Sequence, residues 1–313
     1  MKNKNYFIKR TKCPVCSSKN ISEIYSCNYQ KNPIKSYLNN FYKNRLEWNY
    51  LQKAKYVLIQ CNECEAIYQK YIPNTEFMKR IYEKWLSLKS IKASSRIDTK
   101  KKERIIQEIS ELKLILKKKH KLTFLDYGMG NGEWCLIAKT LGINIYGLEL
   151  SQELLKKARK MGIKTITESG LRKISFNYIN TDQVFEHIPN PLDTLKLLKS
   201  VLDKDGIVKI SVPSGNHIPK YLRKENWDVT KSKKGSLNPI SPLEHITCYT
   251  HKSIVIMGKT IGLKEIKIPL FIQYKCTQFI DNPKNISRKI LKPVYLNYSN
   301  YSTYVFLKRT KNR

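Results

Sequence analysis

The heptapeptide Asp126-Tyr127-Gly128-Met129-Gly130-Asn131-Gly132 carries the strongest fold signal in this chain. It follows a short apolar run, 122–126, and precedes a segment with an apolar helical face, 133–141. Three glycines at alternate positions let the backbone pass close to a ligand, because no Cβ atom stands in the way. A second apolar run, 143–149, and a helix capped by Ser151 repeat the strand–helix order. This alternation predicts an α/β fold with a parallel sheet between helices.

A ligand of such a fold lies in the crevice at the carboxyl ends of the strands. Glu149 ends the second expected strand, where a carboxylate can accept hydrogen bonds from both ribose hydroxyls of an adenosine. The G-x-G-x-G spacing differs from the G-x-G-x-x-G of nucleotide-dependent dehydrogenases. Asp126 could bind the ammonium group of a methionine moiety, and it would repel a pyrophosphate.

Residues 126–132 resemble the glycine motif of class I S-adenosylmethionine-dependent methyltransferases, and Glu149 matches their ribose-binding acid. Three later regions also resemble parts of this family. Residues 182–191 resemble the block after the fourth strand, and residues 206–213 resemble the fifth strand. Residues 263–271 and 302–309 resemble the final antiparallel pair. The resemblance covers about 120–313 and implies a Rossmann-like seven-stranded sheet that binds S-adenosylmethionine.

The resemblance implies a set of cofactor-binding residues: Asp126, Gly128, Gly130, Gly132, Glu149, Glu168 and Asp182. Two features depart from the family pattern. Asn177 follows Phe176 where the family often has Asp at the start of the fourth strand. The acid that contacts the adenine amine after the third strand is not obvious, and Glu168 is the nearest candidate. Backbone groups are the alternative source of these contacts.

Four of the eight cysteines form two C-x-x-C pairs: Cys13 with Cys16, and Cys61 with Cys64. Two such pairs complete a tetrahedral site for a structural zinc ion. Redox-active or unpaired thiols are the alternative, and Cys27 is either a substitute ligand or a lone buried thiol. Disulfides are not expected, because thiols stay reduced in the cytoplasm, which is the expected location.

The front of the chain resembles a group of bacterial enzymes that carry an N-terminal zinc-binding domain before the methyltransferase domain. Many of these act in sugar, capsule or secondary-metabolite pathways. We expect a zinc-binding module over 1–75, a helical connector over 76–119 and the methyltransferase domain over 120–313. The connector includes a helix over 98–118, capped by Asp98, whose apolar face is Ile105, Ile109, Leu112 and Leu116.

Methyl transfer to oxygen or carbon usually needs a base. His187, in the block after the fourth strand, and His245, with Tyr249 close behind it, are the candidate catalytic residues. The alternative is that these histidines only fix loops. The long segment 214–249 could be a lid that selects the acceptor. The alternative interpretation is that the segment is a surface loop without such a role.

The formal net charge is +34, from 59 basic and 25 acidic residues. The positive charge is spread along the chain, which favours a general bias in amino-acid composition as its cause. The alternative is that the charge binds a polyanionic partner. No stretch has the roughly 18 apolar residues of a membrane helix, and no signal peptide is evident.

These features favour methyl transfer from S-adenosylmethionine to a small molecule, a sugar or related intermediate that is nucleotide- or lipid-linked. An RNA methyltransferase that uses the basic surface and the zinc module is the first alternative. A catalytically silent binding protein is the second.

Overall fold

The computed structural model describes residues 6–85, 98–116, 121–227, 233–277, 283–299 and 302–310. They belong to two compact units, each built from separate segments of the chain. The first unit comprises residues 1–94, 185–192 and 212–257, and the second comprises residues 95–184, 193–211 and 258–313. Segment 214–249 therefore lies within the first unit. The functional division at residues 75 and 119 stays a prediction.

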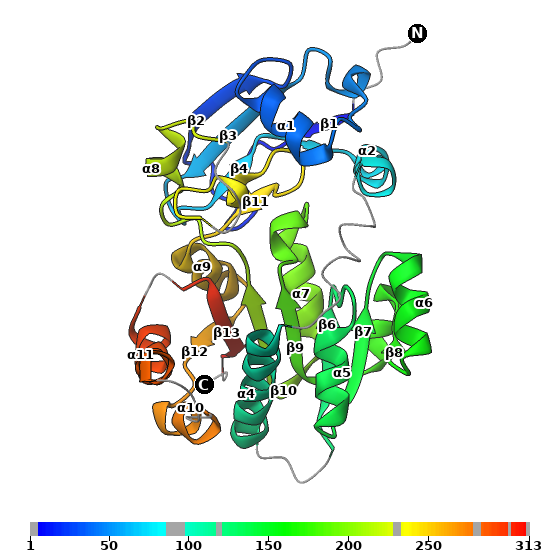
Figure 1. The fold of residues 1–313 in the computed structure, drawn as a ribbon, viewed down its shortest axis with the longest axis vertical. Helices are drawn as coiled ribbons and strands as arrows, with labels where there is room; N and C mark the ends of the chain where they lie inside the picture. Colours follow the sequence, from blue (N-terminus) through cyan, green and yellow to red (C-terminus); the bar gives the residue numbers. More distant parts are fainter. Residues whose placement is uncertain are drawn as a thin grey trace. The chain divides into compact units, whose positions relative to one another are not determined.

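A seven-stranded sheet runs through the second unit in the order β12-β13-β10-β9-β6-β7-β8 (Figure 1). The five strands from β10 to β8 are parallel, and β13 is antiparallel to both β10 and β12. The strands are β6 Thr123–Tyr127, β7 Asn144–Leu148, β8 Lys164–Thr165, β9 Phe176–Asp182, β10 Leu202–Ser211, β12 Leu263–Ile266 and β13 Tyr304–Arg309. The predicted Rossmann-like sheet and its closing antiparallel pair are confirmed.

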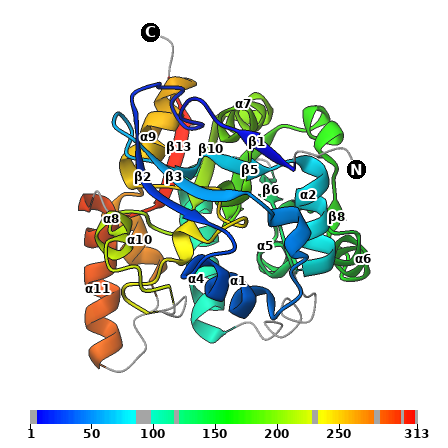
Figure 2. The same cartoon turned by 90° about the horizontal axis from the view of Figure 1, so that it is seen from above.

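Helices cover both faces of this sheet. Figures 1 and 2 show α4 (Thr99–Leu116), α5 (Glu133–Thr140) and α6 (Gln152–Lys160) on one face and α7 (Pro191–Val201) on the other. The Ser151 side chain accepts a hydrogen bond from the Leu154 N–H and caps α6, as its sequence predicts. Helix α10 (Leu270–Cys276) packs against α4 and against α11 (Pro283–Tyr298).

Helix α4 presents the predicted apolar face to the core, since Ile105, Ile109, Leu112 and Leu116 are all buried. The Asp98 carboxylate accepts a hydrogen bond from the Lys100 N–H at 3.3 Å, in line with its predicted capping role. The expected last residues of this helix, 117 and 118, lie outside the described residues.

The same helix buries two carboxyl groups that the apolar pattern does not predict, Glu108 and Glu111. Glu108 forms an ion pair with Lys209 of β10, with both carboxylate oxygens 3.0 Å from Nζ. The hydroxyls of Tyr178 and Tyr304 also donate to Glu108. These donors compensate part of the cost of removing two charges from water.

Asn177, which departs from the family pattern, has a structural role at the start of β9. Its Oδ1 accepts a hydrogen bond from the Thr123 N–H at 2.9 Å, and its Nδ2 donates to Asp203 at 3.1 Å. The amide thus joins the beginnings of β6 and β9 to the part of β10 where its register with β9 shifts. An aspartate could accept the first hydrogen bond but could not donate the second.

The first unit contains a four-stranded antiparallel sheet in the order β11-β4-β3-β2 and a two-stranded pair, β1 with β5. Its strands are β1 Phe7–Lys9, β2 Ile21–Asn28, β3 Lys55–Cys61, β4 Ile67–Gln69, β5 Tyr71–Pro73 and β11 Thr247–Cys248. Its helices are α1 Ile34–Tyr42, α2 Thr75–Arg80, α8 Ile218–Leu222 and the part of α9 (His251–Thr260) up to residue 257. Strand β11 follows segment 218–240 in the chain and pairs with β4, so this late segment extends the cysteine-rich sheet.

Aromatic side chains fill the core of the first unit. Tyr29, Tyr42, Tyr56, Phe77 and Trp85 are almost completely buried. Trp227 joins them from the late segment, with its ring centroid 5.8 Å from that of Tyr56. None of the helices in the described part of the chain has the length and apolar character needed to span a bilayer.

Candidate active site and metal centre

The glycine turn follows β6 at the carboxyl edge of the parallel strands. Gly128, Gly130 and Gly132 all have positive φ, at +79°, +52° and +74°. A Cβ atom at Gly128 would lie 2.6 Å from a methyl of Val184, and one at Gly132 would lie 2.7 Å from a methyl of Ile163. A Cβ atom at Gly130 would meet no protein atom within 4 Å. A side chain at either outer glycine would therefore displace its neighbour, whereas the backbone at Gly130 borders open space.

Met129 fixes the turn on the neighbouring strand. The N–H groups of Gly128 and Met129 both donate to the Leu148 carbonyl at 2.9 Å. The Met129 side chain lies over Gly147 of β7, where an added Cβ would come within 2.1 Å of the sulfur. Gly147 is a site residue that the G-x-G-x-G pattern does not include. Any larger residue at Gly147 would displace the Met129 side chain from this position.

Glu149 lies directly after β7 and beside the turn. Its Oε2 accepts a hydrogen bond from the Gly130 N–H at 3.0 Å, and its Oε1 accepts from the N–H groups of Leu150 and Ser151 at 2.8 and 3.0 Å. A carboxylate has about four lone-pair positions, so three are already used. To bind both ribose hydroxyls, Glu149 would have to release one backbone donor.

Asp126 lies beneath the turn and is only 3% exposed. Asn180 Nδ2 donates to its carboxyl at 2.7 Å, and the Cys135 thiol lies within hydrogen-bond distance at 3.5 Å. Burial raises the pKa of Asp126 to about 6, and the nearby charge of Asp182 acts in the same direction. The structure therefore places Asp126 and Asp182 close together at the ends of neighbouring strands. A direct bond from Asp126 to a ligand stays a prediction.

Glu168 is exposed at the start of a short helix, Glu168–Lys173, after β8. Burial raises the pKa of Tyr127 to about 12, and the negative charge of Glu168 contributes to this shift. All seven predicted cofactor-binding residues thus lie at or just beyond the carboxyl ends of β6, β7, β8 and β9. The strand order reverses between β6 and β9, which is where ligands bind in open α/β sheets.

In the first unit, His187 and His245 lie side by side, with ring centroids 4.9 Å apart. His187 Nδ1 is 3.0 Å from the Glu244 carbonyl oxygen, and His245 Nδ1 is 2.5 Å from that of Asn238. A carbonyl oxygen only accepts, so Nδ1 carries the proton in each hydrogen bond. In a neutral ring, Nε2 then has the lone pair that can accept another proton.

Glu186 completes a cluster with the two histidines. One ligand atom from each of Glu186, His187 and His245 lies within 4.8 Å of the others. Such a cluster can move a proton, and the same set of residue types can bind a divalent metal. Sequence adjacency pointed to Glu186, but nothing in the sequence showed that His187 and His245 would meet.

The third predicted catalytic residue, Tyr249, is completely buried. Its hydroxyl donates to the Phe185 carbonyl at 3.2 Å, and burial raises its pKa well above the usual value. Tyr249 thereby supports the turn that carries His187. The hydroxyl of Tyr82 is 3.3 Å from His187 Nδ1 and is a further polar neighbour of the cluster.

Arg10 contacts the segments beside both histidines and was not identified from the sequence. Its guanidinium donates to the Pro189 carbonyl at 2.7 Å, the Ile246 carbonyl at 2.9 Å and the Thr247 hydroxyl at 3.1 Å. Burial lowers its pKa to about 10, so it remains charged at neutral pH. Arg10 therefore ties together the two chain segments that carry His187 and His245.

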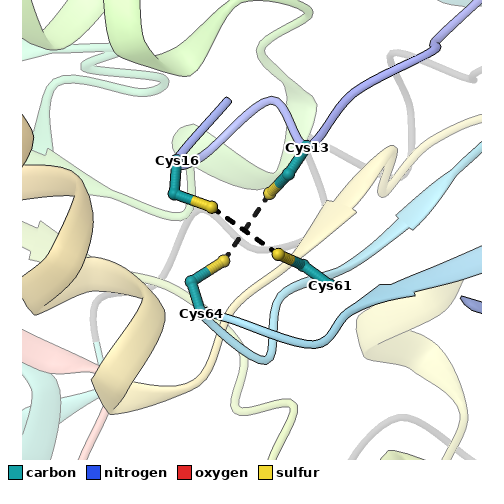
Figure 3. A group of neighbouring side chains, drawn as sticks. All are labelled: Cys13, Cys16, Cys61 and Cys64. Atoms are coloured by element: carbon teal, nitrogen blue, oxygen red, sulfur yellow. Dashed lines mark hydrogen bonds between the residues drawn. The ribbon is translucent and has the colours of Figure 1, made fainter. Parts of the chain in front are cut away.

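The four predicted metal ligands converge on one point in the first unit (Figure 3). Their sulfur atoms lie within 4.8 Å of one another, and the Cys13–Cys64 and Cys16–Cys61 pairs are each 3.6 Å apart. Four sulfurs at tetrahedral positions about 2.3 Å from one ion would be about 3.8 Å apart. The Val15 N–H also points to the Cys13 sulfur at 3.4 Å. The arrangement fits a tetrahedral ion.

Without a cation, the four thiols would not all ionise. The hydrogen bond between Cys13 and Cys64 lowers the pKa of Cys13 to about 6 and raises that of Cys64, and burial raises the pKa of Cys16 to about 11. Four thiolates this close would repel each other strongly, and a divalent cation removes that repulsion. Cys27 lies apart from the four, with its sulfur near the carbonyl groups of Asn28 and residues 31 and 32.

Comparison with known proteins places the chain in a family. A model described as a methyltransferase domain matches residues 97–267, more than half of the chain. An uncharacterized protein of Methanocaldococcus jannaschii is 28% identical over 147 residues, which cover 46% of this chain and 65% of that protein.

Two solved structures are similar at lower identity. The plantazolicin methyltransferase BamL, solved with a triazolic desmethylPZN analog and SAH, is 14% identical, with a TM-score of 0.49 over 74% of this chain and 92% of its own. CalS10, an amino pentose methyltransferase from Micromonospora echinaspora, is 14% identical, with a TM-score of 0.34 over 41% of this chain and 57% of its own. From the family match and its seven-stranded sheet, this chain belongs to the methyltransferase-domain family.

Proposed function

We propose that this protein transfers the methyl group of S-adenosylmethionine to a small-molecule acceptor, a sugar or related biosynthetic intermediate. The observation that carries the proposal is the glycine turn, whose backbone at Gly130 borders open space beside Glu149. That combination gives a nucleoside both a close approach to the backbone and an acceptor for its hydroxyls. The expected cytoplasmic location, where thiols stay reduced, belongs to the same proposal.

When bound, S-adenosylmethionine supplies an electrophilic methyl group on a positively charged sulfur. The residues of this chain then have to hold the donor, orient the acceptor and exclude water. Glu149 would accept hydrogen bonds from the ribose, and the carboxyl groups of Asp126 and Asp182 would favour the positively charged amino-acid end.

We assign the acid–base role to the cluster of Glu186, His187 and His245. Each histidine has its Nδ1 proton directed at a backbone carbonyl, so its Nε2 can take the proton that an acceptor hydroxyl or carbon acid loses on methylation. The buried carboxylate of Glu186 would stabilise the imidazolium that results. His245, which is 6% exposed, is the better shielded of the two bases.

We further propose that Cys13, Cys16, Cys61 and Cys64 hold a structural zinc ion. A site closed by four protein ligands leaves no position for a reacting water. Zinc would therefore stabilise the first unit, including the β3–β4 connection that carries Cys61 and Cys64, without entering the methyl transfer.

RNA is the second candidate acceptor, and the observation that favours it is the net charge of +34. S-Adenosylmethionine labelled on its methyl group, added with the full chain to a lysate of the source cell, distinguishes the two. Label in a small or lipid-linked fraction that is indifferent to ribonuclease supports the proposal. Label that ribonuclease moves from a large fraction to nucleotides assigns the enzyme to RNA, and no transfer beyond a protein-free control contradicts both.

The same assay tests the histidines. His245→Gln and His187→Gln should each slow transfer, and the one that is the base should do so by about a hundredfold or more. Binding of S-adenosylhomocysteine, measured by calorimetry, should stay unchanged. His217→Gln is the matched control, because His217 is an exposed histidine of the same unit that lies outside the cluster. Unchanged transfer in both variants would remove the assigned role.

A further inference from the structure

Helix α11 carries an apolar stripe that faces solvent. Its exposed members are Ile290, Leu291, Val294, Tyr295 and Tyr298. These positions follow spacings of one, three and four residues, so they form one stripe along the helix. Leu291 is 65% exposed and Tyr298 is 75% exposed. Aliphatic and aromatic side chains this exposed, and this contiguous, mark an interaction surface.

The opposite side of α11 is held by the rest of the second unit, so the apolar stripe faces solvent. Pro293 is buried, and Gln273 of α10 donates to Asn297 at 3.0 Å. The Tyr274 hydroxyl donates to the Ile290 carbonyl at 2.9 Å. On α10, Phe271 is 71% exposed and Lys275, one turn later, is exposed as well. Two neighbouring helices therefore expose apolar groups together with basic ones.

The sequence that contains α10 and α11 is almost entirely basic in its charged residues. Between Leu270 and Tyr298 the sequence has five basic residues and one acidic residue. The basic residues are Lys275, Lys284, Arg288, Lys289 and Lys292. A helix with an exposed apolar stripe and only basic charges is typical of segments that lie in the interface of an anionic membrane.

We propose that α11, with Phe271 and Lys275 of α10, docks on the surface of an anionic lipid bilayer. The apolar stripe would enter the boundary between headgroups and acyl chains, and the exposed Lys275 would contact the lipid phosphates. A second copy of the chain is a poorer occupant, because a symmetric contact would bring the same basic residues together. RNA is also poorer, because three of the five exposed side chains of the stripe, Ile290, Leu291 and Val294, are aliphatic and have no π face on which bases could stack.

The test is flotation of the full chain with two kinds of vesicle. One kind is phosphatidylcholine alone, and the other is phosphatidylcholine and phosphatidylglycerol in equal parts. We expect binding to the anionic vesicles that weakens as salt is raised. A Leu291→Ser, Tyr295→Ser double variant should bind about tenfold more weakly or worse, because each side chain contributes apolar burial of at least that size. Lys275→Glu should weaken binding several-fold.

Two matched control variants distinguish binding through this surface from general effects of charge and hydrophobicity. Ile8→Ser removes a similarly exposed apolar side chain, at 50%, from the first unit. Lys156→Glu makes the same charge change at an exposed position of α6. Both should bind like the unaltered chain, and circular dichroism should show that every variant is folded.

Several results would overturn the proposal. The first is equal binding to both vesicle types, and the second is an equal loss in the control variants. A third is concentration-dependent self-association that the double variant abolishes without any vesicle binding, which would assign the stripe to a second copy. RNA binding lost in the double variant, again without vesicle binding, would assign it to nucleic acid. None of these readouts depends on methyl transfer.

Discussion

Gly130 and Gly142 are two glycines in similar local conformations but at different places in the fold. Both have positive φ, at +52° and +80°, and neither would bring an added Cβ within 4 Å of another protein atom. Gly130 lies in the turn after β6, at the carboxyl edge of the sheet. Gly142 lies between α5 and β7, where β7 begins. The pair therefore separates backbone strain from obstruction of the cofactor site.

We expect Gly130→Leu to weaken binding of S-adenosylhomocysteine by about tenfold or more, because the new side chain occupies the space where the ligand meets the backbone. Gly142→Leu should bind as the unaltered chain does. Both variants should lose a similar stability of about 1–3 kcal/mol from strain at positive φ. Calorimetric titration and thermal unfolding measure the two effects. Equal affinities for the two variants would mean that the glycine turn is not the cofactor site.

At the scale of the element, helix α4 combines an apolar face with two buried acids. Glu108 is paired with Lys209, whereas Glu111 has a hydrogen bond from Gln107 Nε2 at 2.8 Å. Burial raises the pKa of Glu111 to about 7, and the negative charge of Glu108 contributes. The folded protein thus holds a proton at Glu111 that the unfolded chain releases near its ordinary value of 4.5.

This difference sets the sign of a pH effect. Below about pH 4.5 both states are protonated, and the stabilising effect is fully present. This stabilisation is lost as pH rises through about 7, where the folded protein also releases the proton of Glu111. The free energy of unfolding therefore falls by up to about 3 kcal/mol between about pH 4.5 and about pH 7. Glu111→Gln removes this contribution, and denaturant unfolding at several pH values should show a smaller fall across that window.

Glu103→Gln is the matched control for this experiment, since it removes an exposed carboxyl from the same helix. The free energy of unfolding should fall more steeply with pH in the unaltered chain than in Glu111→Gln between about pH 4.5 and 7, because only the unaltered chain carries the buried carboxyl. Parallel curves for these two proteins would contradict the shifted pKa.

At the scale of the whole molecule, three separate segments build the first unit. Four cysteines from its first segment form the proposed zinc site, and β11 from its third segment pairs with β4 of the four-stranded sheet. Because metal binding couples to folding, the ion should stabilise all three segments together.

We expect one zinc ion per chain by mass spectrometry of the freshly purified protein. Cys64→Ser should remove it and lower the thermal stability of the first unit. Cys27→Ser should keep it, since Cys27 lies outside the cluster. Folded wild-type protein without metal would refute the zinc assignment. Two ions per chain would show that Glu186, His187 and His245 also bind a metal.

Much of the fold was predictable because its signals are local. The strands β6 and β7, the helices α5 and α6 and the cap at Ser151 follow from apolar spacing over a few residues. The apolar face of α4 was predicted in the same way. Glu108 and Glu111 were not, since a carboxyl on that face is recognisable as buried only when Lys209, Tyr178 and Tyr304 are in place.

The sequence by itself determined the α/β class, the glycine turn with Glu149 and the two C-x-x-C pairs of the cysteine cluster, because each depends on spacing along a short stretch of chain. Only the tertiary structure decided that His187 meets His245, that Arg10 binds the segments beside both of them, and that β11 joins β4. Arg10 and Ile246 are 236 positions apart. Such contacts depend on how distant segments fold back together, which no local pattern encodes.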